Sequence, residues 1–145
     1  MKTIALCASI SFYKEVVDVK NELVKLGYSV LLPDLAEVME RENNFDIEGQ
    51  KKKYLEKDPI GRKAAAIMLH FNKIAKSDGV LVINNEKHGI NGYIGGNVLM
   101  EMGIAFYLEK KIFVMNNYAE NKSTKDEIEG IGSVVLDGDL SKINL

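Results

Sequence analysis

Glu101 is the residue whose type and surroundings most favour chemistry. It lies in residues 97–108, a run so apolar that a helix formed by it must be buried on most sides. A carboxylate removed from water must be paired with a positive charge, hydrogen-bonded or retained for a function. A helix capped by Asn97 places Glu101 in its first turns, where the helix dipole favours an anion. Glu101 is therefore a candidate catalytic carboxylate, and a buried Glu paired with a lysine is the alternative.

A glycine-rich stretch, residues 89–97, comes directly before this predicted helix. Glycines let the backbone approach a ligand closely, and N–H groups at a helix start suit a phosphate or carboxylate. The spacing matches neither the Walker loop nor the dinucleotide fingerprint. The candidate ligand-binding residues here are Gly95, Gly96 and Asn97, and a mobile surface loop is the alternative interpretation.

Ser9 and Ser11 follow the first apolar run of the chain, with Ile10 between them. Their hydroxyls can hydrogen-bond a phosphate or a sugar, so all three residues are candidates for ligand binding. Ser11 is also suited to cap the helix that follows, which is the structural alternative for this residue.

His70 lies beside the apolar face of a predicted helix over residues 63–76. It can donate a proton near neutral pH, or it can be a buried packing residue. His88, in the glycine-rich stretch, is expected to be exposed. No His, Cys, Asp or Glu group has the sequence spacing of a metal site, and Cys7 has no visible histidine partner. We therefore expect neither a metal nor a cysteine nucleophile.

Apolar runs alternate with helical patterns along the whole chain. Parallel strands joined by helical crossovers are the expected arrangement. We predict one α/β domain over residues 1–145, with three layers and a five-stranded parallel sheet of flavodoxin-like or Rossmann-like kind. Residues 34–58, rich in both charges, are predicted to form a solvated helix and loop, or a lid, with a solvated connector as the alternative to the lid. The predicted strands are 3–8, 28–32, 80–83, 112–115 and 134–136, and the predicted helices are 12–26, 63–76, 97–108 and 123–129.

Sheets of this kind bind ligands beyond the carboxyl ends of the strands, near the point where the strand order reverses. The loops concerned are residues 7–12 and 84–97, after the first and third predicted strands. This placement adds Asn84 to the ligand-binding candidates.

Overall charge excludes some classes of partner. The 145 residues include 19 Lys and Arg and 21 Asp and Glu, for a net charge of −2, which argues against a broad nucleic-acid or membrane surface. One cysteine allows no intrachain disulfide, and no run of 18 apolar residues occurs. A cytoplasmic protein with a small-molecule ligand is expected.

The order of these parts resembles the nucleoside 2-deoxyribosyltransferase superfamily, which includes 2′-deoxynucleoside 5′-monophosphate N-glycosidases. Glu101 begins a Glu-Met-Gly-Ile-Ala segment similar to the family's Glu-[Ile/Leu]-Gly-x-Ala helix start, where the Glu is the nucleophile. The likeness extends over nearly the whole chain, and its other segments are residues 8–10, 25–28, 33–34, 76–79 and 108–112.

The resemblance implies cleavage or exchange of the N-glycosidic bond of a deoxynucleoside or its 5′-monophosphate. A covalent deoxyribosyl intermediate would form on Glu101, with His70 as the possible acid, and no cofactor would be needed. Where the family carries an acidic residue six positions before the Glu, this chain has Gly95. The alternatives are a nucleotide-binding or sensing module without turnover, and a scaffold whose helices serve dimerisation. The resemblance also implies a homodimer or higher homo-oligomer.

Overall fold

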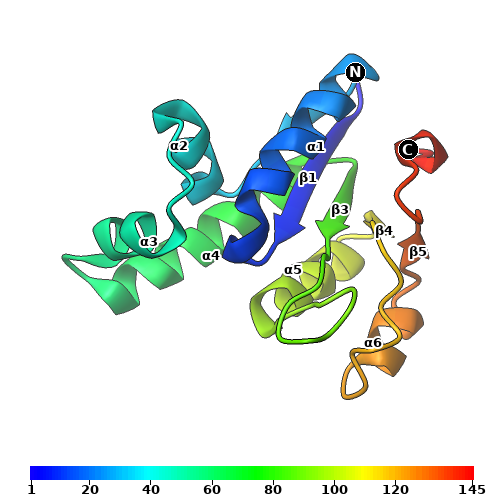
Figure 1. Cartoon of the computed structure of the whole chain (residues 1–145). Helices are drawn as coiled ribbons and strands as arrows, with labels where there is room; N and C mark the ends of the chain where they lie inside the picture. Colours follow the sequence, from blue (N-terminus) through cyan, green and yellow to red (C-terminus); the bar gives the residue numbers. More distant parts are fainter.

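Five parallel strands form one sheet in the order β2-β1-β3-β4-β5 in the computed structural model, which describes residues 1–145 (Figure 1). This confirms the predicted three-layer, flavodoxin-like α/β fold. The strands are β1 (Thr3–Ala8), β2 (Ser29–Leu31), β3 (Gly79–Ile83), β4 (Lys111–Val114) and β5 (Val134–Val135). The helices are α1 (Tyr13–Lys25), α2 (Asp34–Glu42), α3 (Ile47–Leu55), α4 (Pro59–Lys76), α5 (Gly96–Tyr107) and α6 (Lys125–Gly130), with 3₁₀ turns η1 (Ile10–Phe12) and η2 (Leu140–Lys142).

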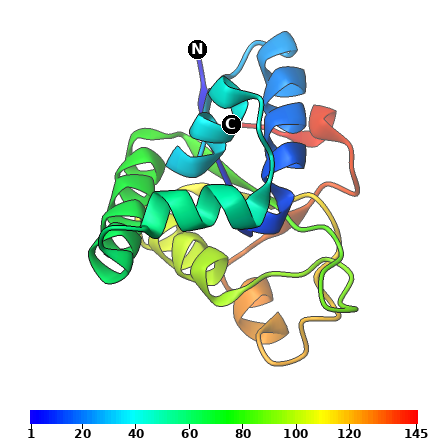
Figure 2. The same cartoon turned by 60° about the vertical axis from the view of Figure 1, so that its left-hand side comes forward.

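The central strand β1 contributes to a separate core on each face of the sheet. Its side chains alternate, as the pleat requires, so Leu6 packs with α1 and η2 while Cys7 packs with α4, α5 and α6. Figure 2 shows α1 and the C-terminal turn on one side of the sheet and α4 and α5 on the other. Cys7 is opposite Val82 of β3, so both central strands supply the core below α4 and α5.

An asparagine network joins the loop after β3 to the loop after β4. The Asn84 side chain donates to the Asn116 carbonyl at 2.8 Å and accepts from the Asn116 N–H at 2.8 Å. Gly92, with φ of +69°, passes so close to this second loop that an added Cβ would lie 1.9 Å from the Asn117 carbonyl oxygen. The network holds the long loop in front of α5 in one position.

Two predicted caps differ from the structure, and the structure gives the helices of a third region in detail. Ser11 does not cap a helix, because it lies within η1 and α1 begins at Tyr13 without a side-chain cap. The capping residue of α5 is Gly95, so Asn97 lies inside the helix. Residues 34–58 contain two helices, α2 and α3, which lie beside α4 in Figure 1. Neither helix is long and apolar enough to span a lipid bilayer, nor is any other in the chain.

Candidate functional site

A cavity of about 350 Å³ opens at the carboxyl ends of β1 and β3, where the strand order reverses. The end of β1, the loop before α5 and the first turns of α5 form one side. Helices α2, α3 and α4 form the other side. The side chains that enclose it are mainly apolar and aromatic, including Ile10, Tyr13, Tyr54, Ile67, Tyr93 and Val98.

Three ionisable side chains meet at the buried end of this cavity. His70 of α4 and Glu101 of α5 line it, and Cys7 of β1 lies directly behind them; the exposed fractions are 4%, 4% and 0%. His70 Nε2 is 3.6 Å from Cys7 Sγ and 3.9 Å from Glu101 Oε2. One potential ligand atom from each residue lies within 4.8 Å of the others. We call these three residues the buried triad.

Two atoms of the buried triad, Glu101 Oε2 and His70 Nδ1, have no hydrogen-bond partner. The other carboxylate oxygen, Oε1, accepts a hydrogen bond from Asn97 Nδ2, one turn earlier on α5, at 3.1 Å. Buried polar groups are nearly always satisfied, so the two unpartnered atoms mark the buried triad as a candidate site.

Burial shifts the proton affinities of the triad in the direction of neutral groups. It raises the pKa of Glu101 to about 7, although hydrogen bonds with Cys7 and Asn97 oppose the shift. It lowers the pKa of His70 to about 4, with Lys73 contributing in the same direction. Burial, followed by the charge of Glu101, raises the pKa of the Cys7 thiol. An unpaired negative charge is therefore energetically unfavourable in the buried triad.

Hydrogen-bond donors and positive charge also border the cavity. No side chain caps α5, and an added Cβ on Gly96 would meet no atom within 4 Å. The first N–H groups of α5 are therefore accessible to a ligand. Lys51 of α3 and Lys63 of α4 also line the cavity. A further lysine, Lys87, donates to Ser9 Oγ at 2.8 Å. This region can accept a phosphate or a carboxylate.

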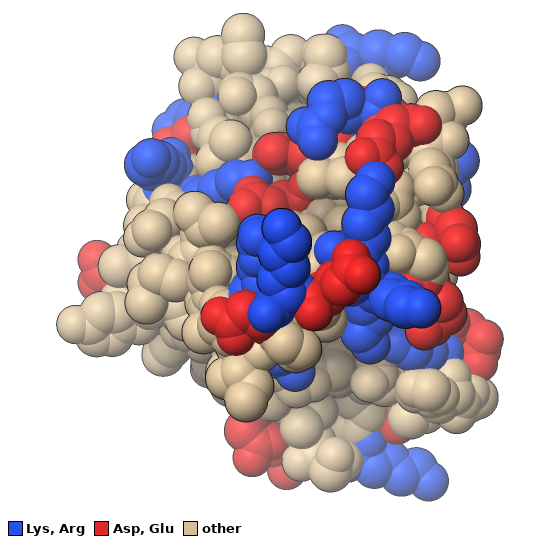
Figure 3. Space-filling view, turned by 90° about the vertical axis from the view of Figure 1, so that its left-hand side faces the viewer, with Lys and Arg blue, Asp and Glu red and all other residues tan.

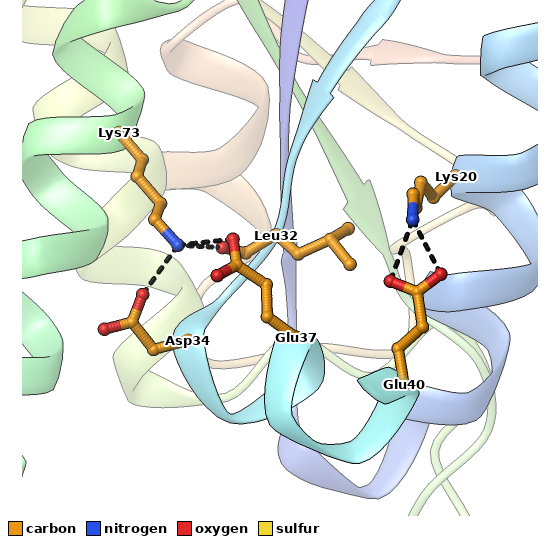
Figure 4. A network of polar contacts seen from close by, with 6 residues as sticks. All are labelled: Lys20, Leu32, Asp34, Glu37, Glu40 and Lys73. Carbon is orange, nitrogen blue, oxygen red and sulfur yellow. Dashed lines mark hydrogen bonds and ion pairs between the residues drawn. The ribbon is translucent and has the colours of Figure 1, made fainter. Parts of the chain in front are cut away.

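A lysine of α4 anchors the α2 side of the cavity. Lys73 Nζ donates to the Leu32 carbonyl at 2.7 Å, to Asp34 Oδ1 at 2.6 Å and to Glu37 Oε1 at 2.7 Å (Figure 4). Because Asp34 lines the cavity, this network fixes the start of α2 as part of the cavity wall.

The outer surface around α2 and α3 carries both signs of charge. Figure 3 shows Lys and Arg side chains interleaved with Asp and Glu, without one large region of a single sign. Lys51, Lys52 and Lys53 are exposed, and Lys53 Nζ is 3.4 Å from Glu42 Oε1. The predicted lid or connector is thus a pair of helices whose inner side closes the cavity.

The structure brings most of the predicted site residues to this cavity. The residues that line it are Ser9, Ile10, His70, Gly95, Gly96, Asn97 and Glu101. Ser11 and Asn84 do not line it. Asn84 is fully buried in the loop network described above, and His88 is exposed, as expected.

Other lining residues, and the triad itself, were not apparent from the sequence. Cys7 lacks a histidine nearby in the chain, and His70 is 63 positions away from it. Tyr13, Tyr54 and Lys63 lie in regions whose sequence pattern indicates only helix. The one sequence signal that could have indicated these residues was their position, at the carboxyl end of the first strand or on the helices next to it.

The fold defines a doubly wound α/β protein with a cavity beside its topological switch point. No family model matches the chain, and no curated protein matches it. Among solved structures, it is similar to FerB, a flavoenzyme NAD(P)H:(acceptor) oxidoreductase from Paracoccus denitrificans. The TM-score is 0.50 and the identity 15%, over 96% of this chain and 77% of that chain. This similarity shows the fold.

These comparisons correct the resemblance described in the sequence analysis. Similarity to the nucleoside 2-deoxyribosyltransferase superfamily is wrong, because no family model matches and the structural similarity is to a flavin-dependent oxidoreductase. The implied activities, glycosidic-bond cleavage or base exchange through an intermediate on Glu101, are overturned with it. So is the alternative of a nucleotide-sensing module. A five-residue Glu-Met-Gly-Ile-Ala segment can occur in any apolar helix that contains one carboxylate, so the match does not identify a family.

Proposed function

We propose that this protein is an enzyme that binds a small anionic, ring-containing molecule in the cavity and activates one of its polar atoms at Glu101 and His70. The observation that carries this proposal is the pair of buried, unpartnered atoms, Glu101 Oε2 and His70 Nδ1, at the end of a cavity. Buried ionisable groups with shifted pKa values that line a pocket are typical of reaction centres, and His70 and Glu101 are such groups.

The size and lining of the cavity limit the ligand. A volume of about 350 Å³ lies near the lower end of the range for ligand pockets, roughly 300–1,000 Å³. Tyr13, Tyr54 and Tyr93 present aromatic rings to it, and aromatic rings favour a flat apolar partner. The accessible start of α5 and the nearby Lys51 and Lys63 favour a phosphate or carboxylate on the same molecule.

A second candidate is flavin-dependent oxidation and reduction, the kind of reaction that FerB, as a flavoenzyme oxidoreductase, carries out. The tyrosines suit a flavin ring, and the start of α5 suits its phosphate. A bound flavin would supply hydride and electron transfer. We place this second because the buried triad has no required part in such chemistry, whereas it is the most unusual feature of the cavity.

Ligand binding and turnover test the two candidates separately. Aromatic phosphates and carboxylates are screened by thermal shift and calorimetry, and each binder is then followed for a chemical product. We expect Glu101→Gln to keep binding within about threefold but to lower turnover at least about a hundredfold. His88→Asn, which changes an exposed histidine outside the cavity, is the control and should leave both unchanged.

Incubation with flavin mononucleotide, followed by gel filtration, tests the second candidate. A yellow protein with quenched flavin fluorescence that oxidises NAD(P)H would favour redox chemistry and would contradict the first candidate. Absence of binding by every anionic ring compound would contradict both.

A further inference from the structure

The geometry points to a site for a divalent transition-metal ion, of which zinc is the best example, held by Cys7, His70 and Glu101. The three side chains supply a thiolate sulfur, an imidazole nitrogen and a carboxylate oxygen, the ligand types that zinc takes in proteins. This inference rests on the proposed function, because it names the group that would activate the ligand at the same reaction centre.

The separations between the ligand atoms suit one small ion. Bond lengths of about 2.3 Å to sulfur and 2.0–2.1 Å to nitrogen or oxygen place tetrahedral ligand atoms roughly 3.3–3.6 Å apart. His70 Nε2 is 3.6 Å from Cys7 Sγ and 3.9 Å from Glu101 Oε2. All three ligand atoms lie within 4.8 Å of one another. The sulfur–nitrogen separation already falls in the tetrahedral range, and the nitrogen–oxygen separation would have to shorten by about 0.5 Å.

Burial gives the second argument. Glu101 and Cys7 are both almost entirely enclosed, and no lysine or arginine forms an ion pair with Glu101. Its carboxylate has only uncharged or weakly basic neighbours, namely His70, the Cys7 thiol and the Asn97 amide, and Asn97 donates to only one of its oxygens. A divalent cation among the three residues would balance the negative charge of a thiolate and a carboxylate, and it would use Oε2, the oxygen that has no partner.

The positions of the three ligands are rigid and the site is accessible. Cys7 is on the central strand, His70 and Glu101 are on helices packed against it, and both helical residues border the cavity. Three protein ligands beside a cavity leave a fourth position for water or a substrate atom, as in catalytic zinc sites. An ion at this site would act as a Lewis acid on a polar atom of the small molecule bound in the cavity.

Cobalt substitution tests this inference on the full chain. After dialysis against chelator, one equivalent of Co²⁺ should produce the intense near-ultraviolet band of a cobalt–thiolate bond. Because Cys7 is the only cysteine, any such band must come from it. One equivalent of Zn²⁺ should then remove the band, and elemental analysis should find about one zinc per chain after gel filtration.

Variants decide whether the three residues act together. Cys7→Ala should remove the thiolate band, and Glu101→Gln and His70→Asn should each weaken Co²⁺ binding at least about tenfold. His88→Asn, the control, removes the only other histidine and should bind as the parent does. Circular dichroism checks that each variant is folded, and a folded variant that binds as the parent does would contradict its residue's role.

Failure of this inference is distinguishable from failure of the proposed function. A folded parent chain that binds no Co²⁺, or binds it without a thiolate band, overturns the metal site whatever the ligand screen gives. A chain that binds metal at the triad but binds no small molecule in the cavity overturns the proposed function and leaves the metal site established.

Discussion

Glu101 is a carboxylate that the fold encloses almost completely, with one oxygen hydrogen-bonded and the other unpartnered. Burial of the charged form is unfavourable, and the raised pKa of Glu101, about 7, reflects this. A carboxyl group whose pKa is higher in the folded state binds protons more tightly there, so folding stability falls as pH rises from about 4.5 to about 7.

The first prediction concerns Glu101→Gln in metal-free protein. Gln keeps the shape and cannot ionise, so we expect the variant to be more stable than the parent by about 1–3 kcal/mol above pH 7. Near pH 4 the difference should be small, because Glu101 is then protonated in both states. Urea unfolding at several pH values measures this. The difference between the two proteins cancels His70, whose lowered pKa acts in the opposite sense. A pH-independent difference would contradict the prediction.

At the scale of elements, α2 is held to α4 chiefly through Lys73, whose ammonium group contacts one carbonyl and two carboxylates. Its side chain is 20% exposed. Hydrogen bonds to charged groups that are mostly buried contribute more to folding stability than those at an open surface.

We therefore expect Lys73→Met to lower the free energy of unfolding by about 1–3 kcal/mol. The matched control is Lys20→Met, which removes a partly buried pair with Glu40 and should cost at most about 1 kcal/mol. Urea unfolding measures both. Equal losses would mean that the extra contacts of Lys73 add nothing.

The loop before α5 provides a prediction about close packing. Gly92→Ala should be destabilising by more than about 1 kcal/mol, because the new Cβ would overlap the Asn117 carbonyl oxygen at a positive φ. Gly89→Ala, also at a positive φ but with open space around it, carries only the conformational cost. A thermal unfolding comparison separates the two effects, and similar losses would show that the contact can relax.

At the scale of the whole molecule, α4 and α5 leave an apolar outer surface. Met68, Leu69, Met100, Phe106 and Tyr107 are between 45% and 78% exposed. Contiguous exposed apolar side chains are typical of interaction surfaces. The homo-oligomer expected from the sequence remains a prediction, and this surface is where we expect two copies to meet.

Sedimentation of the parent chain and of Phe106→Glu tests this expectation. We expect a dimer or larger species for the parent and a shift to monomer for the variant, since a charge in an apolar interface is costly. Val24→Glu, on α1 at the other face of the sheet and 52% exposed, should leave the association unchanged. A parent chain that is monomeric at high concentration would contradict the prediction.

The sequence by itself determined the fold class and most element positions, and it singled out Glu101 as a candidate carboxylate. Apolar periodicity reports how each segment buries its own surface, and that is a local property. The sequence also predicted the end of the sheet at which the cavity opens, because strand–helix alternation implies parallel strands.

Only the tertiary structure decided which side chains meet. Cys7, His70 and Glu101 are far apart in the chain and become neighbours because β1 occupies the middle of the sheet with α4 and α5 on the same face. No local pattern records that proximity. The same packing placed Ser11 and Asn84 outside the cavity, and it converted an isolated thiol and a single carboxylate into a candidate metal centre.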